Sequence, residues 1–320
     1  MMRKIVVFNK MDDPLTREME VFSRFPDVEL VKSNALTEEE LIRDAKDAEV
    51  ILFASAKLTR AVLTKLEKCK LIVRYGIGYD TVDTDAAREC GIFVCNSPNY
   101  GVIDVAEHAF ALMLACCKNL ARLNDRVKCG NWSFDDIGIW NRLTGKTIGF
   151  LGFGKIARAV CGFTKPFATR TLVYDPYVRE DVLAEYGAES VTLDELLASA
   201  DFLTLHLPLS ESTRHTIGKD ELAKMKSSAI IINTSRGPII DESALVDALE
   251  SGVISGAGLD VFEDENGGID PRLPKMRNVV LTPHVAWNTV EAVGAIHEEV
   301  AANVAKYLSG DRPDSIVNGL

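Results

Sequence analysis

The sequence lacks the features of a membrane, secreted or nucleic-acid-binding protein. Its longest apolar stretch, residues 109–117, is well below the roughly 20 residues that span a bilayer. The apolar run near the N-terminus is too short for a signal peptide. Acidic residues outnumber basic ones, 47 to 36, and the formal net charge of −11 argues against nucleic acid or a membrane surface as a partner.

The cysteines form neither a metal motif nor a disulfide framework. There are seven of them, an odd number, and no two have the Cys-x-x-Cys spacing. We therefore expect reduced thiols, no bound metal and a cytoplasmic protein. The remaining composition, 47% hydrophobic and 26% charged, is that of an ordinary globular protein, and a length of 320 residues suggests two domains.

A glycine-rich turn in the middle of the chain has the spacing of a dinucleotide-binding motif. The apolar run 147–151 leads into Gly152-x-Gly154-x-x-Ala157, and a second apolar run ends about twenty residues later at Asp175. The first glycine permits the tight turn, and the second lets the backbone approach a pyrophosphate at a helix N-terminus. Asp175 would accept from the ribose hydroxyls and repel a 2′-phosphate, so the sequence predicts NAD(H) rather than NADP.

Short apolar, β-branched runs alternate with helical patterns along the chain. Those before residue 100 lie at residues 5–8, 28–31, 50–53, 71–73 and 92–94. Those after it lie near residues 147–151, 171–175, 202–206, 229–233, 256–260 and 279–282. Thr37 and Glu40 form a capping box, and Val290 to Leu308 reads as a long amphipathic helix. This alternation predicts an α/β fold with parallel sheets covered on both faces.

Residues 103–122 are expected to form one helix. After Glu107 and His108 it is apolar on nearly every side, so a single buried face cannot accommodate it. It either lies inside a domain or packs against another subunit, and we favour the subunit contact.

Four charged or titratable residues lie just beyond predicted strands, where ligands bind in open α/β sheets: Arg236, Asp260, Glu265 and His284. Arg236 has the planar fork that captures carboxylates, and His284 can give a proton to a forming alkoxide. Glu265 would hold the histidine ring in one tautomer. With a nicotinamide, these groups can reduce a 2-keto acid. Each also has an ordinary alternative, as a surface arginine, a structural histidine or part of a solvated acidic loop.

Over essentially its whole length the chain resembles the D-isomer-specific 2-hydroxyacid dehydrogenase family. The matching segments are Tyr75–Asp80, Val105–Glu107, Gly152–Ile156, Tyr174–Pro176, His206–Leu209, Asn233–Gly237, Gly256–Phe262 and Thr282–Ala286. The catalytic residues of the family fall on Arg236, Glu265 and His284. The resemblance also implies that the amides of Ile77 and Gly78 hold the substrate carboxylate.

The same resemblance implies a set of cofactor contacts and a domain plan. The cofactor contacts are Gly152, Gly154, Lys155, Ile156, Asp175, Leu207, Pro208, Thr213, Thr234, Ser235, Arg236, Asp260 and His284. Asp260 would meet the nicotinamide amide. A flavodoxin-like substrate domain of residues 1–100 and 288–320 would carry the inserted NAD-binding Rossmann domain, residues 101–287, and the cleft would close over substrate. Family members are usually homodimers, which agrees with the apolar helix around 103–122.

Departures from the family pattern bear on the substrate. Trp287 and the pair Cys95-Asn96 resemble the subgroup around the C-terminal-binding-protein corepressors; Trp287 could wall an apolar substrate pocket or pack at the hinge. Phosphoglycerate dehydrogenases typically have Arg before the Ser of the loop after the third strand. Ala54-Ser55 stands there in this chain, which disfavours a phosphorylated substrate, although Lys57 could compensate.

The sequence therefore predicts an NADH-dependent reductase of a small 2-keto acid, running reversibly as a D-2-hydroxyacid dehydrogenase. Glyoxylate or hydroxypyruvate reduction and 3-phosphoglycerate oxidation are the enzymatic alternatives. An NAD(H)-sensing, corepressor-like scaffold is the alternative from another class.

Overall fold

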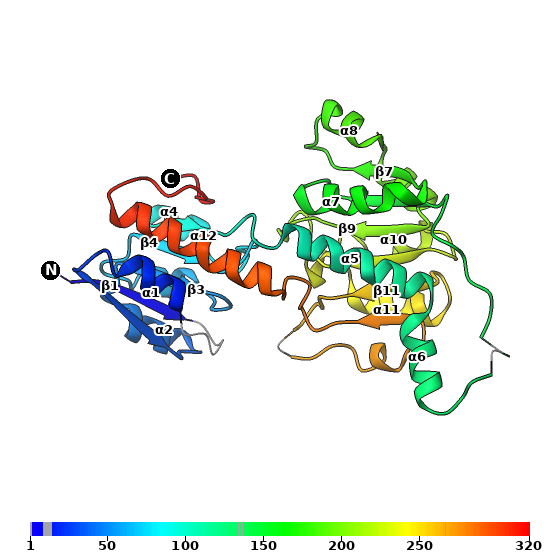
Figure 1. The fold of residues 1–320 in the computed structure, drawn as a ribbon, viewed down its shortest axis with the longest axis horizontal. Coiled ribbons are helices and arrows are strands. Elements are labelled where there is room, and N and C mark those ends of the chain that lie inside the picture. The colour runs from blue at the N-terminus through cyan, green and yellow to red at the C-terminus, as the bar shows by residue number, and fades with distance from the viewer. Residues whose placement is uncertain (1, 9–14, 134, 136, 266) are drawn as a thin grey trace. The chain divides into compact units, whose positions relative to one another are not determined.

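The computed structural model describes residues 2–8, 15–133, 135, 137–265 and 267–320. The chain forms two compact units (Figure 1): unit 1 comprises Met1–Gly101 and Thr289–Leu320, and unit 2 comprises Val102–Asn288. Each unit is a parallel sheet with helices packed on both faces, which confirms the predicted fold class.

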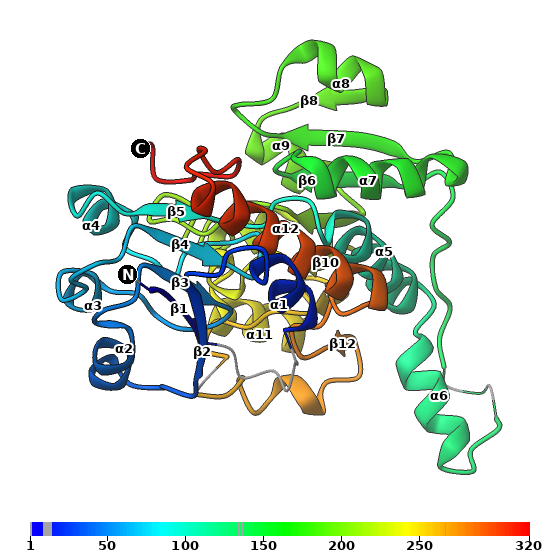
Figure 2. The same cartoon turned by 60° about the vertical axis from the view of Figure 1, so that its left-hand side comes forward.

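Unit 1 has a five-stranded sheet in the flavodoxin-like order β2-β1-β3-β4-β5. Its strands are β1 (Arg3–Phe8), β2 (Val28–Ser33), β3 (Val50–Phe53), β4 (Leu71–Arg74) and β5 (Phe93–Cys95). All five were predicted, because each contains a short run of apolar residues. Helices α1 (Thr16–Phe22) and α12 (Val290–Leu308) cover one face, seen best in Figure 2. The other face is covered by α2 (Glu38–Ala45), α3 (Arg60–Leu63) and α4 (Thr84–Glu89), and the capping box of Thr37 and Glu40 starts α2 as predicted.

Unit 2 has a seven-stranded sheet in the order β12-β11-β10-β9-β6-β7-β8. Its strands are β6 (Thr147–Leu151), β7 (Arg170–Tyr174), β8 (Ala188–Ser190), β9 (Phe202–Leu205), β10 (Ile230–Asn233), β11 (Gly256–Leu259) and β12 (Val279–Leu281). Read from β8, this is the Rossmann order with one added strand. The sequence did not predict β8, because this short edge strand carries two exposed residues and no apolar run.

Helices on both faces enclose the core of unit 2. One face is covered by α5 (Val102–Cys117), α7 (Lys155–Thr164) and α8 (Glu180–Tyr186). The other is covered by α9 (Leu193–Ser199), α10 (Lys219–Lys224) and α11 (Glu242–Glu250). Short 3₁₀ turns lie at Lys165–Phe167, Gly237–Ile239 and Leu273–Lys275. Across the residues that the structure describes, no helix has the length and apolar character needed to cross a bilayer.

The prediction of one helix over residues 103–122 is wrong. The helix α5 ends at Cys117, and a second helix, α6 (Leu120–Lys128), begins after Asn119. Asn119 has a left-handed φ of +55°, a conformation that interrupts a right-handed helix. Much of the apolar surface of α5 is buried within its own unit, since Ala106, Ala109 and Met113 are fully buried against the sheet and α7.

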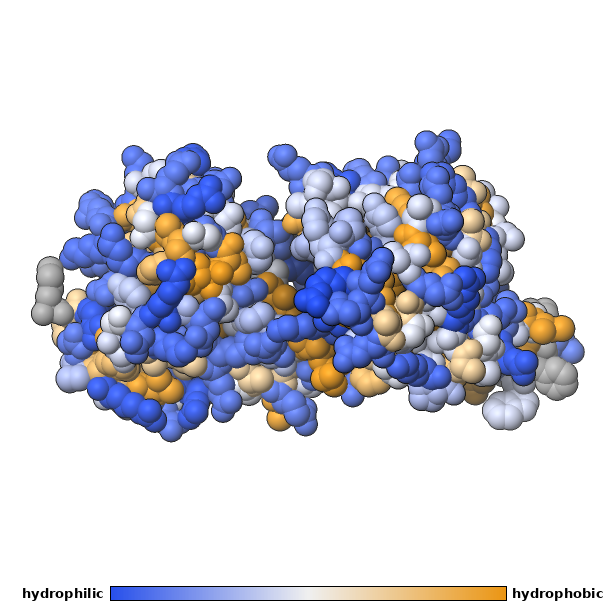
Figure 3. Space-filling model, turned by 90° about the horizontal axis from the view of Figure 1, so that it is seen from above, coloured by the Kyte–Doolittle hydropathy of each residue, from blue (hydrophilic) through white to orange (hydrophobic). Residues whose placement is uncertain are grey.

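By contrast, α6 has no buried residue in the described chain. Large apolar side chains are exposed along and after it: Leu120, Val127, Trp132 and Ile139. Figure 3 shows a mostly hydrophilic face on which apolar atoms emerge in several separate clusters. All seven cysteines are free thiols in the structure.

Candidate active site

The strand register of unit 2 gathers the predicted site residues at one edge of its sheet. Leu151 pairs with Leu205, Leu205 with Asn233, Asn233 with Leu259, and Leu259 with Leu281. The residues that follow these strands are therefore neighbours along the carboxyl edge: Gly152, His206, Thr234, Asp260 and Thr282. The order of strands reverses between β6 and β9, which is where α/β sheets bind dinucleotides.

The glycine-rich turn has the local geometry that the motif requires. Gly152 has a φ of +86°, and a Cβ there would lie 2.9 Å from the carbonyl oxygen of His206, so only glycine fits. Gly154 caps the N-terminus of α7, and a Cβ there would have no atom within 4 Å. Ala157 is fully buried between helix and strand. The open space above the helix N-terminus suits a phosphate group.

Asp175 ties the second strand to this turn. Its Oδ2 accepts a hydrogen bond from the backbone N–H of Phe153 at 2.8 Å, and its Oδ1 accepts from Tyr177 N–H at 2.9 Å. The predicted ribose acceptor is thus also a brace that fixes the glycine-rich turn. This structural role was not predicted, because it depends on the register of β6 and β7.

The other predicted cofactor residues lie on neighbouring loops of the same edge. Lys155 and Ile156 open α7, the loop after β9 carries Leu207, Pro208 and Thr213, and the loop after β10 carries Thr234, Ser235 and Arg236. Thr213 Oγ1 donates to the carbonyl of Pro208 at 2.7 Å, and this hydrogen bond stabilises the loop that carries both residues. The hydroxyl of Thr234 is buried with no hydrogen-bond partner in the described part of the chain. Such a group needs an explanation, and a bound ligand supplies one.

The loop that carries Arg236 is held by Asn233 and Gly237. The Asn233 side-chain amide donates to the carbonyl of Arg236 at 2.9 Å, and its oxygen accepts from the backbone N–H of Ser235 at 3.0 Å. A Cβ on Gly237 would lie 1.9 Å from the backbone of Phe262, so the loops after β10 and β11 touch at this residue. This contact brings the Arg236 loop against the segment that leads to Glu265.

His284 is held in a strained conformation by Asp260. Its φ of +54° is unfavourable for a non-glycine residue, by about 1 kcal/mol. The buried Asp260 compensates: its carbonyl accepts from His284 N–H at 2.8 Å, and its carboxylate accepts from the N–H groups of Val285 and Ala286 at 3.0 and 2.9 Å. Thr282 Oγ1 donates to the same carboxylate at 2.6 Å. Asp260, predicted as a nicotinamide contact, thus organises the histidine loop.

His284 and Glu265 form a hydrogen-bonded pair. The distance from His284 Nδ1 to Glu265 Oε2 is 2.8 Å. Burial alone would raise the pKa of Glu265, but the hydrogen bond and charge of His284 outweigh it, with a smaller effect from the Arg236 charge, and the pKa is lowered. An ionised carboxylate can only accept, so Nδ1 carries a proton and Nε2 is left for chemistry. The three predicted catalytic residues therefore lie in one electrostatic environment.

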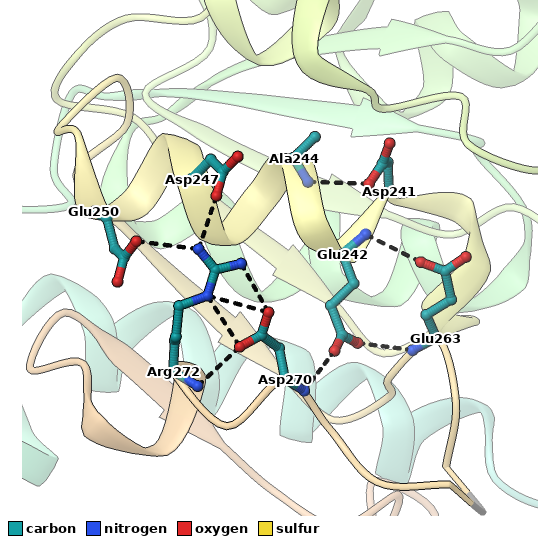
Figure 4. Close-up of polar contacts among 8 residues, drawn as sticks. All are labelled: Asp241, Glu242, Ala244, Asp247, Glu250, Glu263, Asp270 and Arg272. Carbon is teal, nitrogen blue, oxygen red and sulfur yellow. Dashed lines mark hydrogen bonds and ion pairs between the residues drawn. The ribbon is translucent and has the colours of Figure 1, made fainter.

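The segment that carries Glu265 is braced from α11 (Figure 4). Glu242 Oε2 accepts from the N–H of Glu263 at 2.9 Å, and its Oε1 accepts from the N–H of Asp270 at 2.9 Å. Arg272 continues the network through Asp270, Asp247 and Glu250. Sequence reasoning missed this brace, since a glutamate at the start of a helix reads as a favourable dipole contact.

In unit 1, the carbonyls of the predicted substrate loop are held by hydrogen bonds from neighbouring residues. The carbonyls of Gly76, Ile77 and Gly78 accept from Ser97 N–H at 3.0 Å, from Asn96 Nδ2 at 2.7 Å and from Arg74, respectively. In a trans peptide the next N–H points opposite to each carbonyl. The N–H groups of Ile77 and Gly78 therefore point away from the groups that hold the carbonyls of Gly76 and Ile77, and such a pair of neighbouring amides can bind an anion.

Trp287 is half-buried, and its position is set by the histidine loop. Its indole Nε1–H donates to the carbonyl of His284 at 3.2 Å. The ring is therefore oriented by the same segment that orients the imidazole.

Comparison with known proteins agrees with this geometry. Residues 110–286 match the family described as D-isomer specific 2-hydroxyacid dehydrogenase, NAD binding domain. A glyoxylate reductase of Thermococcus litoralis is 36% identical over 94% of this chain and 93% of its own length. The chain belongs to the D-isomer specific 2-hydroxyacid dehydrogenase family. The predicted family is thus confirmed, and with it the class of NAD-dependent oxidoreductases that act on 2-hydroxy acids.

Two further members of the family show its range. A D-3-phosphoglycerate dehydrogenase of Methanocaldococcus jannaschii is 41% identical over 96% of this chain, which spans 58% of the length of that relative. The structure of an Aquifex aeolicus D-lactate dehydrogenase, complexed with NAD and lactic acid, has a TM-score of 0.86 at 33% identity, covering 97% of this chain and 96% of that one. The predicted cofactor, NAD(H), agrees with both the family and this complex.

Proposed function

We propose that this family member is an NADH-dependent reductase of a small, unphosphorylated 2-keto acid, which also runs in reverse as a D-2-hydroxyacid dehydrogenase. The observation that carries the proposal is the 2.8 Å contact between His284 Nδ1 and Glu265 Oε2 at the carboxyl edge of the Rossmann sheet. The charge of Arg236 acts on the same carboxylate. A general acid, its orienting base and a carboxylate-binding fork are the groups that this reaction needs.

Each of the proposed catalytic residues has its own role in the reaction. A nicotinamide cofactor, when bound, supplies the hydride for C2 of the keto acid. Arg236 binds the substrate carboxylate, assisted by the N–H groups of Ile77 and Gly78. His284 gives the proton on Nε2 to the carbonyl oxygen, and Glu265 stabilises the imidazolium before that transfer. In the oxidative direction neutral His284 takes the proton back from the hydroxyl.

The cofactor assignment follows from the glycine-rich turn. The α7 N-terminus and the residues flanking it would bind the pyrophosphate, and Asp175 would accept from the ribose, which favours NADH over NADPH. The Thr234 hydroxyl has no hydrogen-bond partner among the described residues, which favours the binding of a ligand at the loop after β10. The remaining predicted cofactor contacts, including Asp260 and His284, are part of the same proposal.

The choice of substrate rests on the loop after β3 and on Trp287. Ser55 and Lys57 are exposed there, and no arginine precedes the serine, which favours glyoxylate, hydroxypyruvate or another small keto acid over a phosphorylated one. Trp287 would limit the size of the substrate side chain. NADH oxidation in the presence of glyoxylate, hydroxypyruvate, pyruvate, a branched and an aromatic keto acid, and 3-phosphohydroxypyruvate decides the substrate; preference for the phosphorylated acid would contradict this choice.

The enzyme is further proposed to be a cytoplasmic homodimer. The exposed apolar residues of α6 and the segment after it support a subunit contact beside α5, because an amphipathic helix without a buried face is incomplete as a monomer. Its free thiols suit a reducing compartment. Sedimentation equilibrium of the purified protein tests the dimer, and a monomeric mass would refute it.

A further inference from the structure

A buried polar cluster in unit 1 adjoins the loop proposed to bind the substrate carboxylate. Glu18, on α1, is fully buried; its Oε1 accepts from the Tyr75 hydroxyl at 2.8 Å and lies 2.6 Å from Nδ1 of His297, on α12. Tyr75 and His297 are each 8% exposed, and their rings lie 5.3 Å apart. None of the catalytic steps described above uses these three side chains.

Stability does not explain the cluster. The second oxygen of Glu18, Oε2, is buried without a hydrogen-bond partner among the residues described. Burying a carboxylate that is only half satisfied carries a large desolvation cost, and well-packed apolar residues often replace such groups without loss of stability. We therefore look for the role of Glu18 in the side chains that it orients, Tyr75 and His297.

Tyr75 connects the cluster to the substrate loop. It follows the last residue of β4, its backbone N–H donates to the carbonyl of Phe53 at 2.8 Å, and Gly76 comes directly after it. Fixing its side chain therefore fixes the peptide at which the loop leaves the sheet. Arg74, Asn96 and Ser97 hold the carbonyls that follow, so the direction of the loop amides is set by these bonds together with the anchored tyrosine at the start of the loop.

We propose that Tyr75 and Glu18 are positioning residues for substrate: the hydroxyl–carboxylate bond aligns the N–H groups of Ile77 and Gly78 with the substrate carboxylate. His297 holds Glu18 in place from α12. This inference rests on the proposed function, because it takes the carboxylate of a 2-keto acid as the ligand of the loop.

The experiment compares Tyr75→Phe with a matched control. Tyr307 in the same unit also donates to a glutamate, Glu49, at 3.0 Å, and it lies on α12 rather than beside the substrate loop. We measure the KM of the best keto acid, kcat, the Kd of NADH, and the Kd of oxalate on NADH-saturated enzyme. Tyr75→Phe should raise KM and the oxalate Kd about tenfold, the scale of one hydrogen bond to a charged group. Its kcat and NADH affinity should stay within about twofold, and Tyr307→Phe should match wild type.

Equal KM values in the two tyrosine variants would overturn the inference. If Tyr75→Phe does not fold, Glu18→Gln and Glu18→Leu replace it, because both remove the carboxyl group and only glutamine keeps an acceptor for the hydroxyl. KM should then rise in Glu18→Leu and recover in Glu18→Gln; the same KM in both would again overturn it. Wild type that binds oxalate and reduces no keto acid would refute the proposed function alone, and the oxalate affinities of the variants would still decide the positioning role. Wild type that binds neither would refute both.

Discussion

Glu242 and Glu263 exchange two hydrogen bonds, with each carboxylate accepting from the backbone N–H of the other residue, at 3.2 and 2.9 Å. The Glu242 side chain also accepts from the N–H of Asp270 at 2.9 Å. Since Glu263 and Asp270 flank Glu265 in sequence, one carboxylate on α11 restrains both ends of the segment that carries the proposed partner of His284 (Figure 4).

Replacing Glu242 by alanine should therefore impair catalysis more than binding. Releasing the segment lets Glu265 move relative to His284, and a displacement of about 1 Å can cost up to a hundredfold in rate. We expect kcat to fall at least about tenfold, with an altered pH profile, while the NADH Kd stays near that of wild type. Glu250→Ala is the control, because Glu250 also lies on α11 and pairs with Arg272 at 3.2 Å. Equal kcat in the two variants would contradict the role given to Glu242.

Gly154→Ala separates cofactor binding from folding. A Cβ at Gly154 has open space in the protein and its φ is −73°, so the fold should tolerate alanine with little change in Tm. A bound pyrophosphate would meet that methyl group, so the Kd of NADH should rise at least about tenfold. Gly162→Ala on the same helix, where a Cβ also meets nothing, should leave the Kd unchanged. Unchanged NADH affinity in Gly154→Ala would place the cofactor elsewhere.

Asp175 has two functions that substitution can distinguish. Asp175→Asn removes the charge that would repel a 2′-phosphate and keeps one oxygen for a backbone N–H, so the ratio of kcat/KM for NADPH to that for NADH should rise at least about tenfold. Asp175→Ala also removes the bonds to Phe153 and Tyr177, and should weaken the binding of both cofactors. If neither variant changes the cofactor ratio, another residue sets the selectivity.

His206 should make the protein less stable in acid. Burial lowers its pKa from 6.5 to about 3, so the unfolded chain binds a proton below pH 6.5 that the folded chain does not. Stability linked to the neutral ring is complete above pH 6.5 and is lost as the pH falls towards 3. Between pH 7 and pH 5 the loss should be about 2 kcal/mol. Urea unfolding at both pH values should show this loss in wild type and a smaller one in His206→Gln; equal losses would contradict the assignment.

The sequence predicted most of the strands and the glycine-rich turn, but few of the residues that hold the site in place. Buried strands such as 147–151 and 50–53 can be predicted because they are apolar runs in the sequence. The spacing of the glycines likewise predicts the turn after β6. The C-terminal end of α5 did not follow from periodicity, because Asn119 breaks the helix by adopting a left-handed conformation that asparagine tolerates but does not require.

The roles of the supporting residues were not predicted, for a different reason. Glu242, Glu18 and the carboxylate of Asp260 act through backbone groups or buried side chains that are distant in sequence, so no local motif reports them. Reactive residues such as His284 were accessible to sequence reasoning, because strand ends and residue chemistry together point to the carboxyl edge.

The central claim, that His284 donates the proton in NADH-dependent reduction of a 2-keto acid, is tested most directly by NADH oxidation with wild-type protein and His284→Ala on the same keto acid. The account predicts steady turnover of at least one small keto acid by wild type. It predicts a loss of about a hundredfold or more in His284→Ala, with NADH still bound. Wild-type protein that binds NADH yet reduces no keto acid would contradict the account and favour an NAD(H)-sensing scaffold; turnover preserved in His284→Ala would remove the histidine from the mechanism.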